Sequence, residues 1–163
     1  MIDTRRAAGG LVVAAASALV SCAPDRPASE LPTAADVLAL LKQGGGGAVA
    51  VTAPAAGDPL LRPHTYPGRA SEVARCAEQA ITQLPRWEVI GGRSGVIWLT
   101  RRTRLGFVDD VYLLLLPTGD STVVFARSAS RVGAYDFGQN RRNIGELWAA
   151  LERPSAAASS CSA

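Results

Sequence analysis

Apolar and polar residues alternate along four consecutive runs in the second half of the chain. These runs are residues 87–91, 96–103, 107–117 and 121–132, and they are separated by glycine-rich segments or by the turn sequence Pro-Thr-Gly-Asp. A period of two places successive side chains on opposite faces of a strand, and short turns join neighbouring antiparallel strands. The pattern therefore predicts a four-stranded antiparallel meander.

Two segments with helical periodicity flank the meander. Residues 71–84 space apolar side chains three and four positions apart, with Ser71 as the expected N-cap and Pro85 ending the helix. Residues 139–152 repeat this spacing. The apolar positions of the second segment are Ile144, Leu147, Trp148 and Leu151. Because each helix has one apolar stripe, both are expected on one face of the sheet, which makes the predicted fold class α+β, a two-layer sandwich.

The segment before the first main helix carries weaker signals. Thr33 followed by Asp36 is a capping-box pattern, which predicts a short helix that stops at Gly44. Residues 48–52 are a candidate for a fifth strand at the sheet edge. Residues 53–69 contain several prolines, so they are expected to be extended coil.

The N-terminus has the organisation of an export signal. Arg5 and Arg6 precede an apolar run, residues 11–20, which at about ten residues is too short to cross a bilayer of about 30 Å. The sequence Leu-Val-Ser-Cys ending at Cys22 resembles the lipobox of bacterial lipoproteins. That resemblance implies cleavage before Cys22, a diacylglyceryl group on its thiol, and acylation of the new amino terminus, with palmitate as the expected chain.

The predicted organisation has four parts: a lipoprotein signal peptide over residues 1–21, a tether with the short helix and edge strand over 22–58, the sandwich domain over 59–152, and a disordered Ser/Ala-rich tail over 153–163. Two or three acyl chains are enough for lasting membrane attachment. The mature protein is therefore expected to be tethered to a membrane through its lipid anchor rather than to span it.

The expected location is the cell envelope, with the domain facing the periplasm or the surface. Ala23, rather than an aspartate, follows the lipobox cysteine, which in a Gram-negative bacterium favours the outer membrane. Two alternatives stay open, an uncleaved apolar segment and an ordinary secreted protein in which Cys22 is incidental. Cys76, on the buried face of a predicted helix, and Cys161, in the tail, are expected to be free thiols.

The composition argues against nucleic-acid binding and against a metal site. The chain has 17 Lys and Arg against 14 Asp and Glu, a net charge of +3 that is dispersed along the sequence. No basic stripe interleaved with aromatic residues exists, so nucleic acid is not an expected partner. His64, the single histidine, and the three cysteines lack the spacing of a zinc site. No metal or other cofactor is predicted.

A dense polar cluster follows the last predicted strand, in the sequence RSASRVGAYDFGQNRRN of residues 127–143. Symmetric pairing about the Pro-Thr-Gly-Asp turn places Asp110 opposite Arg127 and Asp109 opposite Ser128. This register predicts an ion pair across the two strands.

Alternation along the last strand places Arg127 and Arg131 on one face of the sheet and Ser128 and Ser130 on the other. At the exit of this strand, Asp136 is expected to accept hydrogen bonds from the free N–H groups of the last helix. The cluster is therefore expected to join the sheet to that helix.

The first turn of the last helix contains Asn140, Arg141 and Arg142, where the helix dipole disfavours positive charge. Arginines at this position are expected to have an acidic partner or an anionic ligand. Asp109 and Asp110 are the nearest candidates for the acidic partner.

Two interpretations of the cluster follow. The full candidate set is Arg104, Asp109, Asp110, Arg127, Ser128, Ser130, Arg131, Asp136, Asn140 and Arg141. In the first interpretation, part of this set cradles a small anion such as a lipid headgroup or a carboxylate. That cradle consists of Arg127, Arg131, Asn140 and Arg141. In the second, the same residues satisfy one another and only fasten the sheet to the helix.

Several runs of this sequence resemble a bacterial family of unknown function, DUF1499. They are RTRLGFVDDV (102–111), RSASRVGAYDFGQNRRNI (127–144), PLLRPHTYPG before the first main helix and LPRWEVI after it. The likeness covers residues 59–152, and its most specific part is the pattern Ser-x-Ser-Arg-x-Gly-x-x-Asp-x-Gly-x-Asn. The resemblance implies a small α+β domain, often exported or membrane-associated, with no established activity, cofactor or catalytic residues.

The motifs favour a binding or interaction module over an enzyme. Ser128 and Ser130 are nucleophile types, but His64 lies in the predicted coil, and no Gly-x-Ser-x-Gly or Ser-x-x-Lys motif exists. We therefore expect a membrane-anchored envelope lipoprotein whose non-enzymatic domain binds a small anionic ligand or an envelope protein. The alternative is a hydrolase that uses the Ser/Arg/Asp cluster of residues 109–141.

Overall fold

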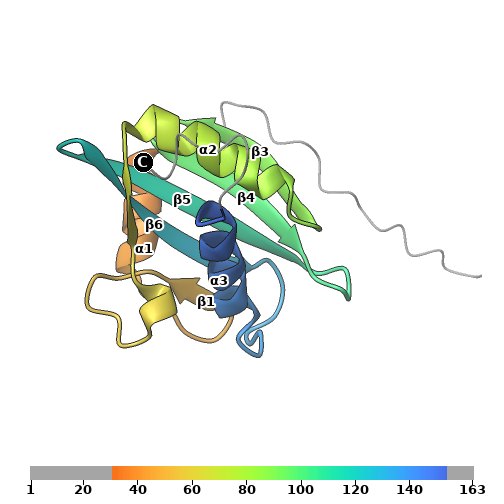
Figure 1. Cartoon of the computed structure of the whole chain (residues 1–163). Helices are drawn as coiled ribbons and strands as arrows, with labels where there is room; N and C mark the ends of the chain where they lie inside the picture. The colour runs from red at the N-terminus through yellow and green to blue at the C-terminus, as the bar shows by residue number, and fades with distance from the viewer. Residues whose placement is uncertain (1–30, 154–163) are drawn as a thin grey trace, which may run out of the picture.

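The centre of the molecule is an open antiparallel sheet of six strands (Figure 1). The computed structural model describes residues 31–153. In chain order the strands are β1 (Val49–Val51), β2 (His64–Pro67), β3 (Trp87–Arg93), β4 (Val96–Arg102), β5 (Val108–Thr118) and β6 (Ser121–Ser130). Strands β3 to β6 form the predicted meander, and their spatial order is β6-β5-β4-β3. The predicted fold class is thus confirmed.

Two short strands share the outer edge of β6. β1 pairs with the end of β6, around Ser128, and is the edge strand that the sequence predicts. β2 pairs with the beginning of β6, where Tyr66 lies opposite Thr122. The expectation of extended coil over residues 53–69 is therefore wrong for this stretch. Pro67 stands at the last position of β2, where an edge strand tolerates a residue that cannot donate a hydrogen bond.

Helices α2 (Ala70–Thr82) and α3 (Gln139–Leu151) lie on the same face of the sheet, as the sequence predicts (Figure 1). Their apolar stripes and the inward side chains of the strands form the main core. Fully buried members of this core include Ile81, Leu99, Val111, Leu113, Ile144 and Leu147. The predicted N-cap at Ser71 is displaced, because α2 begins at Ala70 and the Glu72 carboxylate accepts a hydrogen bond from the Arg69 N–H.

A third helix, α1 (Ala34–Lys42), covers part of the opposite face of the sheet (Figure 1). Its capping box is the predicted one, since the Thr33 N–H donates to the Asp36 carboxylate at 2.8 Å and the Asp36 N–H donates to the Thr33 hydroxyl at 3.3 Å. Val37 is fully buried in a small second core against Val96 and Leu114. The sheet is thus covered on both faces at this end.

The hairpin between β5 and β6 has a register that differs by two residues from the predicted one. Asp110 lies opposite Ala129, and Asp109 lies opposite Ser130. The difference arises because Thr118 still belongs to β5, so that the turn begins only after it. A shift of two keeps every side chain on its predicted face, because strands have a period of two.

Cys76 is disulfide-bonded, so the expectation of a free thiol at this position is wrong. The chain has three cysteines, and the other two, Cys22 and Cys161, lie outside the described residues. The predicted signal peptide, the lipobox and most of the predicted tail also lie outside them. Within residues 31–153 no helix is long and apolar enough to span a membrane.

The loop after α1 packs against the loop after β6 at Gly47, and we predict that this contact tolerates no side chain. Gly47 has a φ of +57°, and a Cβ added to it would lie 2.5 Å from the Ala134 carbonyl oxygen. Gly44 also has a positive φ, +77°, but nothing lies within 4 Å of its added Cβ. Gly47→Ala should therefore lower the free energy of unfolding by about 1–3 kcal/mol more than Gly44→Ala does.

Urea unfolding followed by tryptophan fluorescence measures this difference. Equal losses in the two variants would contradict a close approach of the two loops at this point.

Candidate functional site

A network of buried polar side chains joins β5, β6 and α3. Asp109 from β5, Ser128 from β6, and Asn140 and Asn143 from α3 are all at most 1% exposed. Buried polar groups are costly unless they are hydrogen-bonded. These four residues, together with Ser130 and Asp136 at the margin, are called the buried polar network below.

Asn140 makes the most contacts within the network. Its Oδ1 accepts a hydrogen bond from the Ser128 hydroxyl at 2.6 Å. Its Nδ2 lies within 2.6 to 2.9 Å of three acceptors. These acceptors are the Ala48 carbonyl oxygen, the Ser130 hydroxyl and the Asp136 carboxylate. One amide therefore connects α3 to β6 and to the residue that precedes β1.

Asn143, one turn further along α3, connects the helix to β5. Its Nδ2 donates to the Asp109 carboxylate at 2.8 Å and to the Ser128 hydroxyl at 3.0 Å. The Ser130 hydroxyl donates to the other Asp109 oxygen at 2.7 Å. Asp109 is thus a buried carboxylate held by neutral donors, and it makes no ion pair with any described residue.

The start of α3 is capped as the sequence predicts. The Asp136 carboxylate accepts hydrogen bonds from the Gly138 N–H at 2.9 Å and from the Asn140 N–H at 2.6 Å. Gly138, with a φ of +75°, supplies the left-handed turn that brings the chain into the helix. The polar sequence at this position is therefore explained by the satisfaction of free helix N–H groups.

Two predicted site residues, Arg127 and Arg131, lie on the opposite face of the sheet. Arg131 donates two hydrogen bonds to Asp110, at 2.8 and 2.9 Å, and Trp98 Nε1 donates to the same carboxylate at 2.9 Å. The Arg127 Nε is buried without a hydrogen-bond partner. Burial lowers the pKa of Arg127, and the neighbouring Tyr112 and Asp110 oppose this shift.

Arg141 lies at the surface and pairs with Asp58, a residue of the segment predicted as coil. Both oxygens of the Asp58 carboxylate accept hydrogen bonds from the Arg141 guanidinium, and these bonds lower the pKa of Asp58. The predicted partners for the arginines of this helix turn, Asp109 and Asp110, are therefore wrong. The sequence offers no local signal for this pair, because Asp58 lies far from Arg141 along the chain.

The predicted anion cradle is consequently not formed. Arg127 and Arg131 are separated from Asn140 by the sheet, and Arg141 is paired at the surface. Asp110, Ser128, Arg131 and Asn140 each form a hydrogen bond with a neighbouring side chain, which agrees with the second interpretation, in which the residues of the cluster satisfy one another.

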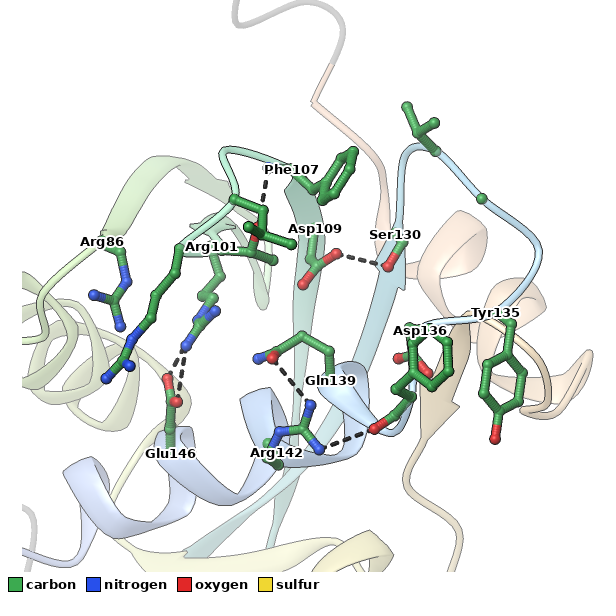
Figure 2. Close-up of a pocket in the computed structure, with 16 residues that line it drawn as sticks. Arg86, Arg101, Phe107, Asp109, Ser130, Tyr135, Asp136, Gln139, Arg142 and Glu146 are labelled. Carbon is green, nitrogen blue, oxygen red and sulfur yellow. Dashed lines mark hydrogen bonds and ion pairs between the residues drawn. The ribbon is translucent and has the colours of Figure 1, made fainter.

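A pocket of about 630 Å³ lies next to the buried polar network (Figure 2). It opens between the β4–β5 loop, residues 103–107, and the segment that connects β6 to α3, residues 131–138. It is called the loop pocket below. Four predicted site residues line it, namely Arg104, Asp109, Ser130 and Asp136.

The carboxylates of the loop pocket are all occupied by protein donors. Glu146 accepts a hydrogen bond from Arg101 at 3.0 Å (Figure 2). It accepts another from Trp87 Nε1 at 3.0 Å. Asp109 and Asp136 belong to the buried polar network. Arg101 is 5% exposed, so its guanidinium lies beneath the surface and is neutralised by Glu146.

Three further arginines of the loop pocket, Arg86, Arg104 and Arg142, are exposed. No carboxylate within residues 31–153 forms an ion pair with any of them. Arg142 donates to the Phe137 carbonyl oxygen at 2.9 Å and to the Gln139 side-chain oxygen at 3.2 Å, both of which are neutral (Figure 2). The wall of the pocket thus carries three exposed guanidinium groups that form no ion pair with any described residue, although the carboxylates of Asp109 and Asp136 line the same pocket.

Most of the remaining pocket wall is apolar and exposed. Leu105, Phe107, Val132, Tyr135 and Phe137 line the loop pocket, and each of them is at least 53% exposed. These five residues, Arg86 and Arg101 are not among the candidate site residues that the sequence predicts. The available signal was the presence of bulky apolar residues in segments that otherwise have the character of turns.

The chemical groups at the pocket include one hydroxyl beside one carboxylate. The Ser130 hydroxyl donates to Asp109, and it also accepts a hydrogen bond from Asn140. His64 does not line the pocket, since its ring stacks on Trp148 at 4.4 Å and pairs with Glu152 at 3.0 Å. Within residues 31–153 no group of three potential metal ligands is found.

Comparison with known proteins gives one family and one structure. A family model described as "Protein of unknown function (DUF1499)" matches residues 20–151. No curated protein matches the chain. The crystal structure of TTHA0849 from Thermus thermophilus is 14% identical, over 60% of this chain and 97% of that chain, with a TM-score of 0.37. At that TM-score the likeness carries no argument about fold or function.

We predict that Asn140 is essential for stability. Asn140→Ala removes the amide that satisfies Ser128, Ser130 and Asp136, so it should lower the free energy of unfolding by about 3 kcal/mol or more. Arg141→Ala, one residue away, removes only an exposed ion pair and should have a small effect. Equilibrium unfolding in urea compares the two variants, and a similar loss in both would refute the central place of Asn140.

Proposed function

This chain belongs to the DUF1499 family, a family of unknown function, and from that premise we propose a role for its loop pocket. In this proposal the domain is a non-enzymatic module that binds a small amphipathic anion, and it is held at the cell envelope by a lipid on Cys22. The binding part of the proposal comes from the pocket, and the location comes from the sequence.

One observation carries the binding proposal. Three exposed arginines without a carboxylate partner among the described residues stand beside five exposed apolar side chains, around a pocket of about 630 Å³. This volume is in the range of sites for small ligands, which typically combine apolar walls with a few polar anchors. Guanidinium groups bind carboxylates, sulfonates and phosphates through paired charge-assisted hydrogen bonds. A ligand with one acidic group and an apolar body satisfies both parts of the wall.

The surroundings of Ser130 favour binding over hydrolysis. A serine nucleophile needs a base that takes its proton and a third group that orients that base. The Ser130 hydroxyl instead donates to a buried carboxylate, which is itself held by Asn143. The same hydroxyl accepts a hydrogen bond from Asn140, so one of its two lone pairs is also engaged in the network.

The disulfide at Cys76 supports the envelope location. Structural disulfides persist in oxidising compartments outside the cytosol, which is where a lipoprotein domain would lie. The disulfide and the lipid anchor are also linked, because the thiol of Cys22 cannot both carry a lipid thioether and form a disulfide with Cys76. If Cys22 is lipidated, the partner of Cys76 is Cys161, the one cysteine that remains.

We predict that the loop pocket distinguishes an anion from its uncharged analogue. The two probes are 1-anilinonaphthalene-8-sulfonate and N-phenyl-1-naphthylamine, which share the apolar body and differ in the sulfonate. Fluorescence titration should show tighter binding of the sulfonate. Arg104→Gln should weaken sulfonate binding roughly tenfold, because it removes one charge-assisted hydrogen bond, and should leave the uncharged probe unaffected.

Arg93→Gln is the matched control, because Arg93 is an exposed arginine at the end of β3 that does not line the pocket. Equal affinity for the two probes, or an equal effect of the two substitutions, would contradict an anion site. Turnover of a p-nitrophenyl ester that Ser130→Ala abolishes would favour the hydrolase alternative instead.

The lipid anchor leads to a linked prediction on all three cysteines. Peptide mapping of membrane-extracted protein under non-reducing conditions should show an acylated Cys22 and a disulfide between Cys76 and Cys161. Cys22→Ser should release the protein from the membrane fraction, whereas Cys161→Ser should not. A disulfide between Cys22 and Cys76 would rule out the anchor.

A further inference from the structure

The exposed apolar side chains of this domain are concentrated at one place. Seven large apolar side chains are exposed within residues 31–153, and five of them lie on the two loops around the loop pocket. These five, Leu105, Phe107, Val132, Tyr135 and Phe137, are called the apolar rim. Scattered exposed apolar residues are normal, but a contiguous group marks an interaction surface.

The apolar rim is held outward by the backbone rather than left loose. Phe137 has a φ of +52°, in the left-handed region that a bulky residue rarely adopts, and its side chain is 81% exposed. The Arg142 guanidinium donates to its carbonyl oxygen, and the neighbouring Asp136 is fixed as the cap of α3. The rings of Tyr135 and Phe137 meet edge to face, with centroids 5.0 Å apart. The fold therefore presents an ordered aromatic pair to its surroundings.

Positive charge accompanies the apolar rim. Arg104 stands next to Leu105 at the tip of the β4–β5 loop, and Arg86 and Arg142 line the same pocket. None of the three has an anionic partner among the described residues. Apolar and aromatic side chains next to unpaired arginines fit the interface of an anionic bilayer, where rings and aliphatic chains enter the acyl boundary and guanidinium groups meet phosphates.

We propose that the apolar rim inserts into the surface of a phospholipid bilayer that contains anionic lipids, with Arg104 bound to a headgroup phosphate. The occupant is a bilayer rather than a protein because the rim consists of the tips of two loops, which penetrate a fluid surface, and because its charge complements lipid phosphate. The loop pocket then opens toward the membrane. This inference is independent of the lipid on Cys22 and of the identity of any pocket ligand.

Insertion can be measured with tryptophan as a reporter. The three native tryptophans are at most 9% exposed, so they give a background that lipid should not change. Phe137→Trp, in a chain of residues 22–163 with Cys22→Ser, is mixed with vesicles of phosphatidylcholine and phosphatidylglycerol at about seven to three, so that the surface is anionic. We expect dibrominated acyl chains to quench its fluorescence. Leu116→Trp, at an exposed position near the β5–β6 turn, should stay unquenched.

Vesicle flotation tests the same contact by affinity. Leu105→Ala combined with Phe137→Ala should weaken binding to the anionic vesicles by on the order of tenfold or more, because two apolar side chains no longer insert. Leu116→Ala combined with Arg93→Gln, at the other end of the meander, should bind as the parent chain does. Vesicles of phosphatidylcholine alone should bind more weakly.

Three results would overturn the proposal. They are unquenched fluorescence in the Phe137→Trp variant, equal binding of the two double variants, and equal binding to charged and uncharged vesicles. If the apolar rim instead docks a protein, the fluorescence of the Phe137→Trp variant should stay unquenched. Sulfonate affinity in the loop pocket is measured separately. A failure of the vesicle experiments therefore leaves the ligand-binding proposal intact, and a failure of the sulfonate titration leaves the membrane proposal intact.

Discussion

The side-chain amide of Asn140 is the contact on which the rest of this structure depends. It is fully buried, and it bonds to two strand serines, to the cap of its own helix and to the backbone before β1. A buried amide of this kind is stable only when every partner is in place, so it selects one position of α3 on the sheet. Apolar packing alone would hold the helix without fixing that position so narrowly.

The position of α3 in turn determines the loop pocket. The segment between β6 and α3 is short and carries Asp136, Phe137 and Gly138, so the cap geometry decides where the aromatic side chains point. Asp109 ties the beginning of β5 to the same helix through Asn143. Both walls of the pocket thus depend on the buried polar network, although none of the pocket's exposed residues belongs to it. Ligand contacts could therefore change in this domain while the network stays constant.

The elements that the sequence predicts correctly are those with local signals. Strand alternation, helix periodicity and the caps at Thr33 and Asp136 all act within a few residues, and all are found in the structure. The predictions that are wrong concern residues whose partners lie far away along the chain. β2 becomes a strand only because β6 offers it an edge, and Arg141 meets Asp58 only after the chain has folded. The sequence does not predict the pocket, because the residues that line it come from turns, where an exposed phenylalanine follows no periodic pattern.

The sheet also acts as a partition between two polar systems. Asp110, Arg127 and Arg131 lie on one side, and Asp109 and the two helix asparagines lie on the other, although Asp109 and Asp110 are adjacent in sequence. Because no side chain is shared between the two sides, energetic coupling across the sheet should be weak. The two halves of this conspicuous motif can therefore drift separately during evolution, and a change in one needs no compensating change in the other.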